Sequence, residues 1–161
     1  MNQMVQPKRL LRPDIHSLVP HGGAMSLLGR FVEADAETLT AEVDITPESM
    51  FCADGQVGAW VGVEYMAQAV AAHAGWCARQ RGEPVRVGFL LGARKYACSV
   101  PAFPVGRVLR IHVRHALQGE NGLGAFDCRI EDAGSGMEVA TATITVFQPD
   151  HVEEFLQRSS V

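Results

Sequence analysis

Glu64 is the side chain in this sequence best suited to acid–base chemistry. It is the only charged residue between Gly58 and Arg79, in a stretch of mostly small and apolar residues. Burial of an unpaired carboxylate is costly, so we expect Glu64 to be hydrogen-bonded or held protonated, and either state suits a proton donor. Gln68 follows one helical turn later on the same face, where it could orient the carboxylate. Alternatively, Glu64 only complements the positive end of the helix or reaches solvent.

His21 is the histidine whose sequence context best fits a partner for Glu64. It lies in Val19-Pro20-His21-Gly22-Gly23, a loop that could direct a side chain into a cleft. Histidine exchanges protons near neutral pH. An ordinary loop or capping histidine is an equally good interpretation. The remaining histidines have no comparable context and are expected to be structural or exposed: His16, His73, His112, His115 and His151.

Neither a metal site nor a familiar hydrolase or nucleotide motif is predicted. The four cysteines are far apart, without a C-x-x-C pair, and are expected to be reduced and mostly buried: Cys52, Cys77, Cys98 and Cys128. His112 and His115 fall on opposite faces of a predicted strand, which argues against a shared metal ion. The chain contains no G-x-S-x-G, P-loop, G-x-G-x-x-G or H-E-x-x-H motif.

A long helix is needed to position Glu64 and Gln68. Residues 58–79 carry small apolar side chains on every side, which predicts a helix buried almost all round. Basic residues and Gly82 suit its C-terminal end. Upstream, Asp14 is expected to cap a short turn over residues 15–18, residues 25–45 to form a hairpin, and residues 47–57 to form a loop.

The second half of the chain predicts strands. Four strand-like runs are separated by turns rich in glycine and proline: residues 85–98, 107–117, 124–131 and 138–147. Strands joined by such turns are mostly antiparallel, and a helix without a polar face needs cover. We therefore predict an α+β fold in which about five to six antiparallel strands curve around one long helix. A basic stripe on one strand, Arg110, His112 and Arg114, is expected to be a solvated face.

Composition limits the classes of function. At 161 residues the chain is expected to form a single domain over residues 1–161, with residues 1–12 loosely ordered. It lacks a run of about 18 uncharged apolar residues and a signal-peptide pattern, so we expect a cytoplasmic protein without membrane association. A net charge of −4 and 7% aromatic residues argue against nucleic-acid binding.

Four segments resemble the 3-hydroxyacyl-[acyl-carrier-protein] dehydratases in order and spacing. VEYMAQAV is similar to the central-helix signature, in which Glu followed by x-M-A-Q carries the catalytic acid. The others are LVPHGGAMSLLGRF, VGFLLGARKY and VPAFPVGRVL, and the resemblance spans roughly residues 16–147. The pattern is most similar to a divergent subgroup of predicted dehydratases. Some of these are encoded with aryl-polyene pigment pathways, where a partner dehydratase subunit is also present.

This resemblance implies a hot-dog fold, a dimer with acyl tunnels at its interface, and no metal or redox cofactor. The substrate would be an acyl-phosphopantetheine thioester on acyl-carrier protein or coenzyme A. In the family a histidine takes the α-proton, the helix carboxylic acid protonates the departing β-hydroxyl, and an N–H at the helix start polarises the thioester carbonyl. Glu64 matches the acid, and the expected substrate-binding residues are Gly58, Ala59, Gln68 and Met50.

One departure from the family pattern leaves three hypotheses open. The family's loop histidine is replaced by Met50, fourteen residues before Glu64. His21 could replace that base, which would make the chain a working 3-hydroxyacyl thioester dehydratase. Alternatively, the chain is a non-catalytic, acyl-thioester-binding subunit of a heteromer with a paralogous dehydratase, or a hot-dog thioesterase in which Glu64 activates water. Arg94 and Lys95, with Arg79 or Arg81, are expected to dock an acidic acyl-carrier protein.

Overall fold

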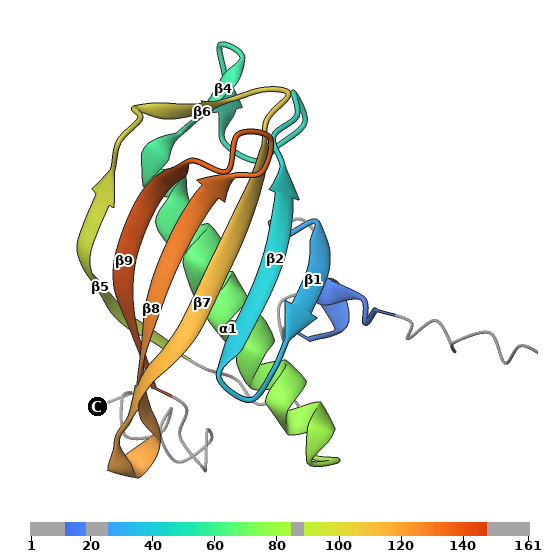
Figure 1. The fold of residues 1–161 in the computed structure, drawn as a ribbon, viewed down its shortest axis with the longest axis vertical. Coiled ribbons are helices and arrows are strands. Elements are labelled where there is room, and N and C mark those ends of the chain that lie inside the picture. Colours follow the sequence, from blue (N-terminus) through green and yellow to red (C-terminus); the bar gives the residue numbers. More distant parts are fainter. Residues whose placement is uncertain (1–11, 19–25, 85–88, 148–161) are drawn as a thin grey trace, which may run out of the picture.

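The computed structural model describes residues 12–18, 26–84 and 89–147 (Figure 1). A single turn of 3-10 helix, η1 (Ile15–Ser17), opens this part of the chain, and the Asp14 side chain accepts a hydrogen bond from the backbone N–H of His16 at 3.0 Å. Strands β1 (Arg30–Ala34) and β2 (Thr38–Asp44) then pair antiparallel. The predicted cap and hairpin are both confirmed.

One long helix, α1 (Gly62–Gln80), follows a 3-10 turn, η3 (Ala59–Val61). The predicted start at Gly58 is four residues early, because Gly58 belongs to a strand and the next three residues form the tighter turn. At the other end, Gly82 has φ +70°, the left-handed conformation expected of glycine just after a helix.

The remaining long strands form a six-stranded antiparallel sheet with the hairpin, in the order β1-β2-β7-β8-β9-β5. Their bounds are β5 (Phe89–Cys98), β7 (Val108–Gln118), β8 (Leu123–Asp132) and β9 (Glu138–Phe147), with a short turn η4 (Glu120–Gly122) between β7 and β8. These bounds agree with the sequence prediction to within one residue, except for β5. Residues 85–88 of that prediction lie outside the described part of the chain.

A second, three-stranded sheet was not predicted. It contains β3 (Cys52–Ala53), β4 (Gln56–Gly58) and β6 (Ala102–Pro104), and lies at the N-terminal end of the helix (Figure 1). The sequence contained a signal for it, because an Asp-Gly pair such as Asp54-Gly55 is typical of a tight hairpin turn. In the structure these two residues have φ +53° and +76°, as the central residues of such a turn do.

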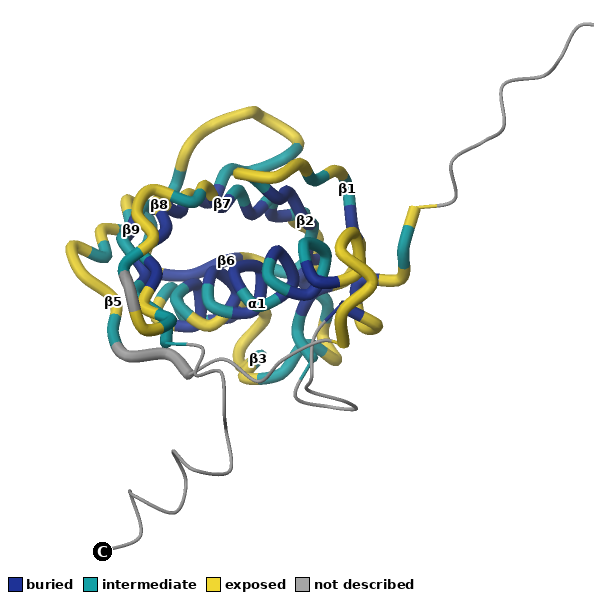
Figure 2. The backbone as a smooth tube through the Cα atoms, turned by 90° about the horizontal axis from the view of Figure 1, so that it is seen from below, coloured by how far each residue is buried: buried dark blue, intermediate teal, exposed yellow. Residues whose placement is uncertain are grey.

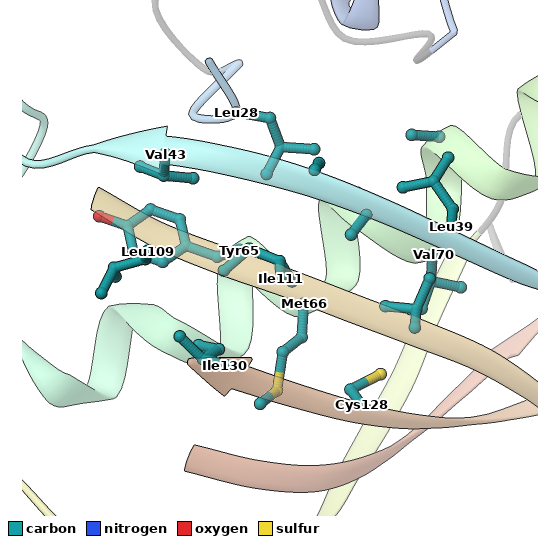
Figure 3. Close-up of a cluster of buried hydrophobic side chains, with 14 of the residues drawn as sticks. Leu28, Leu39, Val43, Tyr65, Met66, Val70, Leu109, Ile111, Cys128 and Ile130 are labelled. Atoms are coloured by element: carbon teal, nitrogen blue, oxygen red, sulfur yellow. The ribbon is translucent and has the colours of Figure 1, made fainter. Parts of the chain in front are cut away.

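The core lies between one side of α1 and the concave face of the large sheet (Figure 2). Tyr65 and Met66 project from the helix among side chains of β2, β7 and β8 (Figure 3). Along β7, Leu109, Ile111 and Val113 are buried at every second position, as the predicted alternation requires. Complete burial of such a side chain contributes about 1.5–3 kcal/mol.

The other side of α1 is less covered than predicted. Glu64 and Gln80 are exposed in the single chain, and Ala67, Ala71 and Ala74 are partly buried. The prediction of a helix buried almost all round is therefore wrong for the single chain, because the sheet covers only one side. The architecture of one long helix wrapped by an antiparallel sheet is the hot-dog fold. Within the described residues, no helix is both long and apolar enough to cross a membrane.

Candidate functional site

Glu64 lies in the first turn of α1 and is hydrogen-bonded to Gln68. The Gln68 side-chain nitrogen, Nε2, donates to Glu64 Oε1 at 3.1 Å. The hydrogen bond expected of Glu64 is present, and the carboxylate also lies at the helix start and reaches solvent, as the alternative interpretation had it. The helix begins at Gly62, and Glu64 is exposed in the single chain.

Gln68 is held in a defined orientation by the backbone. Only 4% of Gln68 is exposed, and its Oε1 accepts a hydrogen bond from the N–H of Leu27 at 2.7 Å. Rotation of the amide by 180° would place two N–H groups against each other at Leu27. The bond to Leu27 therefore directs the amide NH₂ of Gln68 towards Glu64.

A cavity of about 470 Å³ extends along α1 from Glu64. Its walls come from one side of the helix, the β1–β2 turn and the ends of β7, β8 and β9 nearest the C-terminus of α1. The lining residues are Ala36, Glu64, Ala67, Gln68, Val70, Ala71, His73, Ala74, Cys77, Arg81, His115, Gln118, Gly122, Gly124, Phe126 and Val146. Pockets of this volume accommodate small organic ligands. The partly buried alanines of the helix thus border a space that begins at a carboxylate.

His73 is buried in the cavity wall and is already hydrogen-bonded. Its Nε2 lies 3.1 Å from the carbonyl oxygen of Asp35 and 3.6 Å from the sulfur of Cys77. Burial lowers the pKa of His73, because the charged imidazolium is poorly solvated there. Burial likewise raises the pKa of the Cys77 thiol. At neutral pH the two groups therefore form an uncharged pair.

His115 is the second histidine of this wall. Its ring contacts Phe126 with centroids 4.9 Å apart, and Phe126 also contacts His73 at 5.8 Å. Within the described part of the chain, His115 Nε2 is a buried atom without a hydrogen-bond partner. Sequence reasoning gave neither histidine a role. For His115 the sequence did contain one signal: the alternation along β7 places it on the same face of the sheet as Leu109. The alternation does not show that a cavity lies beside that face.

The basic stripe on the outer face of β7 is partly neutralised. Arg110 pairs with Glu42 at 3.2 Å, and His112 Nε2 lies 3.0 Å from Glu131 Oε1. The hydrogen bond from His112 lowers the pKa of Glu131. Arg110 thus forms ion pairs and His112 a hydrogen bond with acidic neighbours, whereas the sequence predicted a merely solvated stripe. His112 and His115 do lie on opposite faces of β7, as predicted.

Of the predicted site residues, His21 falls outside the described part of the chain, and Met50 lines a different cavity from Glu64. His21 lies in the segment 19–25, outside the described residues, and His151 is outside them as well. Met50 lines a different cavity, of about 330 Å³, together with Tyr65 and Ser49. The structure therefore gives Glu64 and Met50 separate cavities within one chain.

The backbone just before the helix is already paired at Gly58 and Ala59, the two residues expected to contact the thioester. Gly58 pairs with Ala102 in the small sheet, and the N–H of Ala59 donates to the carbonyl of Pro101 at 3.1 Å. The Ala59 carbonyl in turn accepts a hydrogen bond from the Tyr96 hydroxyl. Neither η3 nor α1 has a side-chain cap. A donor to a thioester would therefore have to be an N–H that follows Ala59.

The predicted docking residues are divided between two surfaces. Arg94 and Lys95 are exposed on β5, where Lys95 has φ +55° in an irregular part of the β5–β9 pairing. Arg79 hydrogen-bonds to the Ser17 hydroxyl at 2.9 Å. Arg81 lines the cavity and pairs with Glu83 at 3.2 Å.

In the described ranges, no group of three or more His, Cys, Asp or Glu side chains could hold a metal ion. All four cysteines are free thiols. Cys128 is buried, with its pKa raised to about 12 by burial, whereas the other three are partly exposed.

Comparison with known proteins gives both a family match and structural relatives. The family model described as ApeP dehydratase matches residues 13–157. A chain of the dehydratase heterocomplex ApeI:P from Xenorhabdus doucetiae is 28% identical, with a TM-score of 0.83, over 92% of this chain and 99% of that one. No curated protein sequence matches the chain.

More distant solved structures share the fold alone. A hypothetical thioesterase with coenzyme A from Streptococcus pneumoniae is 16% identical, with a TM-score of 0.57, over 74% of this chain and 84% of that one. The virulence protein Cj0977 from Campylobacter jejuni is also 16% identical, with a TM-score of 0.60, over 85% of this chain and 89% of that one. Both likenesses agree with the hot-dog architecture.

Proposed function

The chain belongs to the ApeP-like dehydratase family, and from that membership we propose that it is a catalytic subunit of a 3-hydroxyacyl thioester dehydratase. The reaction removes water from a 3-hydroxyacyl thioester and leaves a trans-2-enoyl thioester. The observation that carries this proposal is the Glu64 carboxylate, oriented by Gln68 at one end of the cavity of about 470 Å³.

Glu64 would act as the general acid. In the reaction a base removes the α-proton, the carbon–oxygen bond to the β-hydroxyl breaks, and the protonated carboxyl group of Glu64 gives its proton to the leaving oxygen to form water. Its exposure in the single chain suits this role, because the carboxyl group must reach a substrate. A backbone N–H of the uncapped first helical turn would polarise the thioester carbonyl.

His73, in the cavity wall, is poorly placed to be the base. His73 Nε2 is occupied by the Asp35 carbonyl, and His73 is about 14 Å further along the helix axis than Glu64 at 1.5 Å per residue. We propose that His21 supplies the base, either to Glu64 of the same chain or to Glu64 of a second chain in a dimer.

The runner-up function is a non-catalytic, thioester-binding subunit. Met50 stands where the family has its histidine, and the similar Xenorhabdus doucetiae chain is part of a dehydratase heterocomplex. A paralogous subunit could then supply the histidine or the whole active site. We expect at least a dimer in both versions, and we propose that a second subunit covers the exposed side of α1 next to Glu64.

Acyl-carrier docking is proposed for the exposed pair Arg94 and Lys95. Carrier proteins are acidic, and two adjacent cations on an edge strand offer complementary charge.

The proposed function is tested by hydration of a crotonyl pantetheine thioester, followed by loss of the enoyl ultraviolet absorbance. The full chain is assayed alone and in a complex with a paralogous dehydratase subunit. Turnover that depends on Glu64 in either preparation supports the proposal. Turnover of the complex that is insensitive to Glu64 assigns the chain to the non-catalytic role.

A further inference from the structure

The second cavity, of about 330 Å³, lies beside Tyr65, and we call it the Tyr65 pocket. Its walls include the apolar side chains of Leu27, Val43 and Met50. Ligand pockets are typically built in this way, from mostly apolar side chains and a few polar groups that fix the orientation of the ligand, and this volume is enough for a small one.

Most polar groups of the Tyr65 pocket are either paired within the protein or exposed. Ser49 Oγ accepts a hydrogen bond from a backbone N–H at 2.9 Å, and Ser26 Oγ lies 2.7 Å from His16 Nδ1. Glu48 also lines the pocket and is exposed, and its negative charge disfavours an anionic ligand. The pocket therefore suits an uncharged ligand.

The Tyr65 hydroxyl is the polar group that remains for such a ligand. Within the described residues it has no hydrogen bond, yet it is not one of the fully buried atoms without a partner, which are Arg110 Nε and His115 Nε2. The hydroxyl therefore keeps an accessible surface, although only 2% of Tyr65 as a whole is exposed. Figure 3 shows it pointing away from the helix on the side of Val43, which lines the same pocket.

This hydroxyl is suited to donate a hydrogen bond. Burial raises the pKa of Tyr65 to about 12, so the group keeps its proton at neutral pH. A carbonyl oxygen can accept that proton in a hydrogen bond and carries no net charge, whereas an alkyl group in the same place would leave the donor unpaired.

We propose that the Tyr65 pocket binds a short acyl group whose carbonyl oxygen accepts a hydrogen bond from the Tyr65 hydroxyl. The walls formed by Leu27, Val43 and Met50 contact the alkyl part of that group. The delivery of the acyl group as a thioester rests on the proposed function, whereas the pocket and its donor do not. The site is distinct from the cavity that begins at Glu64, so it gives the chain a second place to hold an acyl group.

The test compares two pantetheine derivatives that differ by one oxygen. S-butanoyl pantetheine is a thioester, and S-butyl pantetheine is the thioether of the same length without the carbonyl oxygen. Neither carries a 3-hydroxyl or a 2,3-double bond, so calorimetric titration of the full chain does not depend on turnover. The native chain should bind the thioester roughly three- to tenfold more tightly, the usual range for one net hydrogen bond. Tyr65→Phe should remove this preference.

Tyr96 provides the matched control, because its hydroxyl already donates to the Ala59 carbonyl. Tyr96→Phe loses that bond, so it should lower the thermal midpoint and keep the preference for the thioester. Tyr65→Phe should leave the thermal midpoint unchanged or raise it, because no hydrogen bond within the fold is lost. A fall as large as that of Tyr96→Phe would show that the Tyr65 hydroxyl is bonded within the protein, and would overturn the proposal.

Three binding results would also overturn it. Equal affinity of the native chain for the two probes would mean that the Tyr65 hydroxyl binds only water. A preference that survives Tyr65→Phe would place the bound carbonyl elsewhere, and an equal loss of affinity for both probes would mean that Tyr65 contacts the pantetheine arm. The proposed function is tested separately: a Tyr65-dependent preference without hydration of a crotonyl thioester keeps the pocket and loses the catalytic role, and hydration without the preference does the reverse.

Discussion

Gln68 bridges the backbone of the N-terminal segment and the carboxylate of Glu64, since its Oε1 accepts from the Leu27 N–H at 2.7 Å and its Nε2 donates to Glu64 at 3.1 Å. The two bonds use opposite ends of one buried amide. The position of the carboxylate therefore depends on the packing of residue 27 against the helix, as well as on the helix itself.

Replacement of Glu64 by Gln should remove the proton donor while the fold persists. The side chain is exposed in the single chain, so we expect the thermal midpoint to change little. Turnover should fall by about 10²- to 10⁴-fold, the usual effect of losing a general acid. The measurement is enoyl thioester hydration by the chain and its complex, and His21→Ala should cause comparable damage.

The control for this substitution is Glu138→Gln, at an exposed glutamate that begins β9. It makes the same chemical change far from α1 and should leave turnover unaffected. Activity that survives both Glu64→Gln and His21→Ala would contradict the site assignment and direct attention to a partner chain or to Cys52.

Gln68 is expected to be a positioning residue, and a double-mutant cycle can show it. Gln68→Met has a similar volume but loses both hydrogen bonds, so the Leu27 N–H is left unpaired at a cost of about 1–3 kcal/mol of unfolding free energy. In the native background it should lower kcat with little change in KM. In the Glu64→Gln background it should destabilise equally but lower turnover little further.

A purely structural role for Gln68 would give a different cycle. The loss of turnover would then be the same in both backgrounds, because it would follow the loss of folded protein. Urea unfolding of all four proteins provides the stability side of the comparison.

The burial of His73 should make the protein less stable in mild acid. Burial depresses the pKa of His73 in the folded chain below the ordinary value of 6.5, so the unfolded chain binds a proton first as the pH falls. The stabilisation is present above about pH 6.5 and is lost as the pH falls towards the folded-state pKa. The polar groups near this ring include His115, Cys77, Asp35 and the backbone of Ala36.

Thermal midpoints measured from about pH 7.5 to about pH 5.5 test this expectation, across the ordinary histidine pKa. The native chain should lose stability over this range, and His73→Phe should lose distinctly less. His16→Asn, at an exposed histidine, should follow the native curve. Parallel curves for the native chain and His73→Phe would show that another group controls the acid sensitivity.

The sequence patterns predicted most of the fold because the long strands alternate strongly and the helix is one long run of small apolar residues. The alternation of Leu109, Ile111 and Val113 identified the inner face of β7, and the small apolar residues before Arg79 identified the helix. The small sheet was missed because two- and three-residue strands carry no periodicity. Its best signal was the Asp54-Gly55 turn alone.

The site was less predictable, because it depends on which side of each element meets another. The pairing of Glu64 with Gln68 follows from helical spacing, but the exposure of Glu64 depends on where the sheet ends. His115 shows the same limit: alternation predicts its face, whereas the cavity in front of it depends on side chains of four other segments. The relation of His21 to Glu64 stays a prediction.

Gly75 should tolerate no side chain, although it lies in a helix. Exchange of a helical glycine for alanine normally stabilises by about 1 kcal/mol. Here a Cβ atom would collide with the backbone carbonyl of Leu18, because η1 packs directly on α1 at this point. We expect Gly75→Ala to destabilise by about 1–3 kcal/mol. Gly92→Ala on β5, where a Cβ meets nothing within 4 Å, is the control and should change stability little.

Charge reversal at Arg94 tests the proposed docking surface. An acidic carrier protein would be attracted to Arg94 and Lys95 through water, so Arg94→Glu should weaken binding of a carrier-linked acyl thioester. The loss of affinity should be largest at low ionic strength and smaller at high salt, because salt screens the interaction. A short pantetheine thioester, which lacks the carrier, should bind equally well to both proteins. Arg114→Glu, at an exposed arginine of β7, reverses the same charge on another surface and should leave both affinities unchanged. Equal losses for the carrier-linked and the free thioester would show that Arg94 contacts the substrate itself. If Arg114→Glu weakened carrier binding as much as Arg94→Glu, net charge rather than a local docking surface would control the encounter.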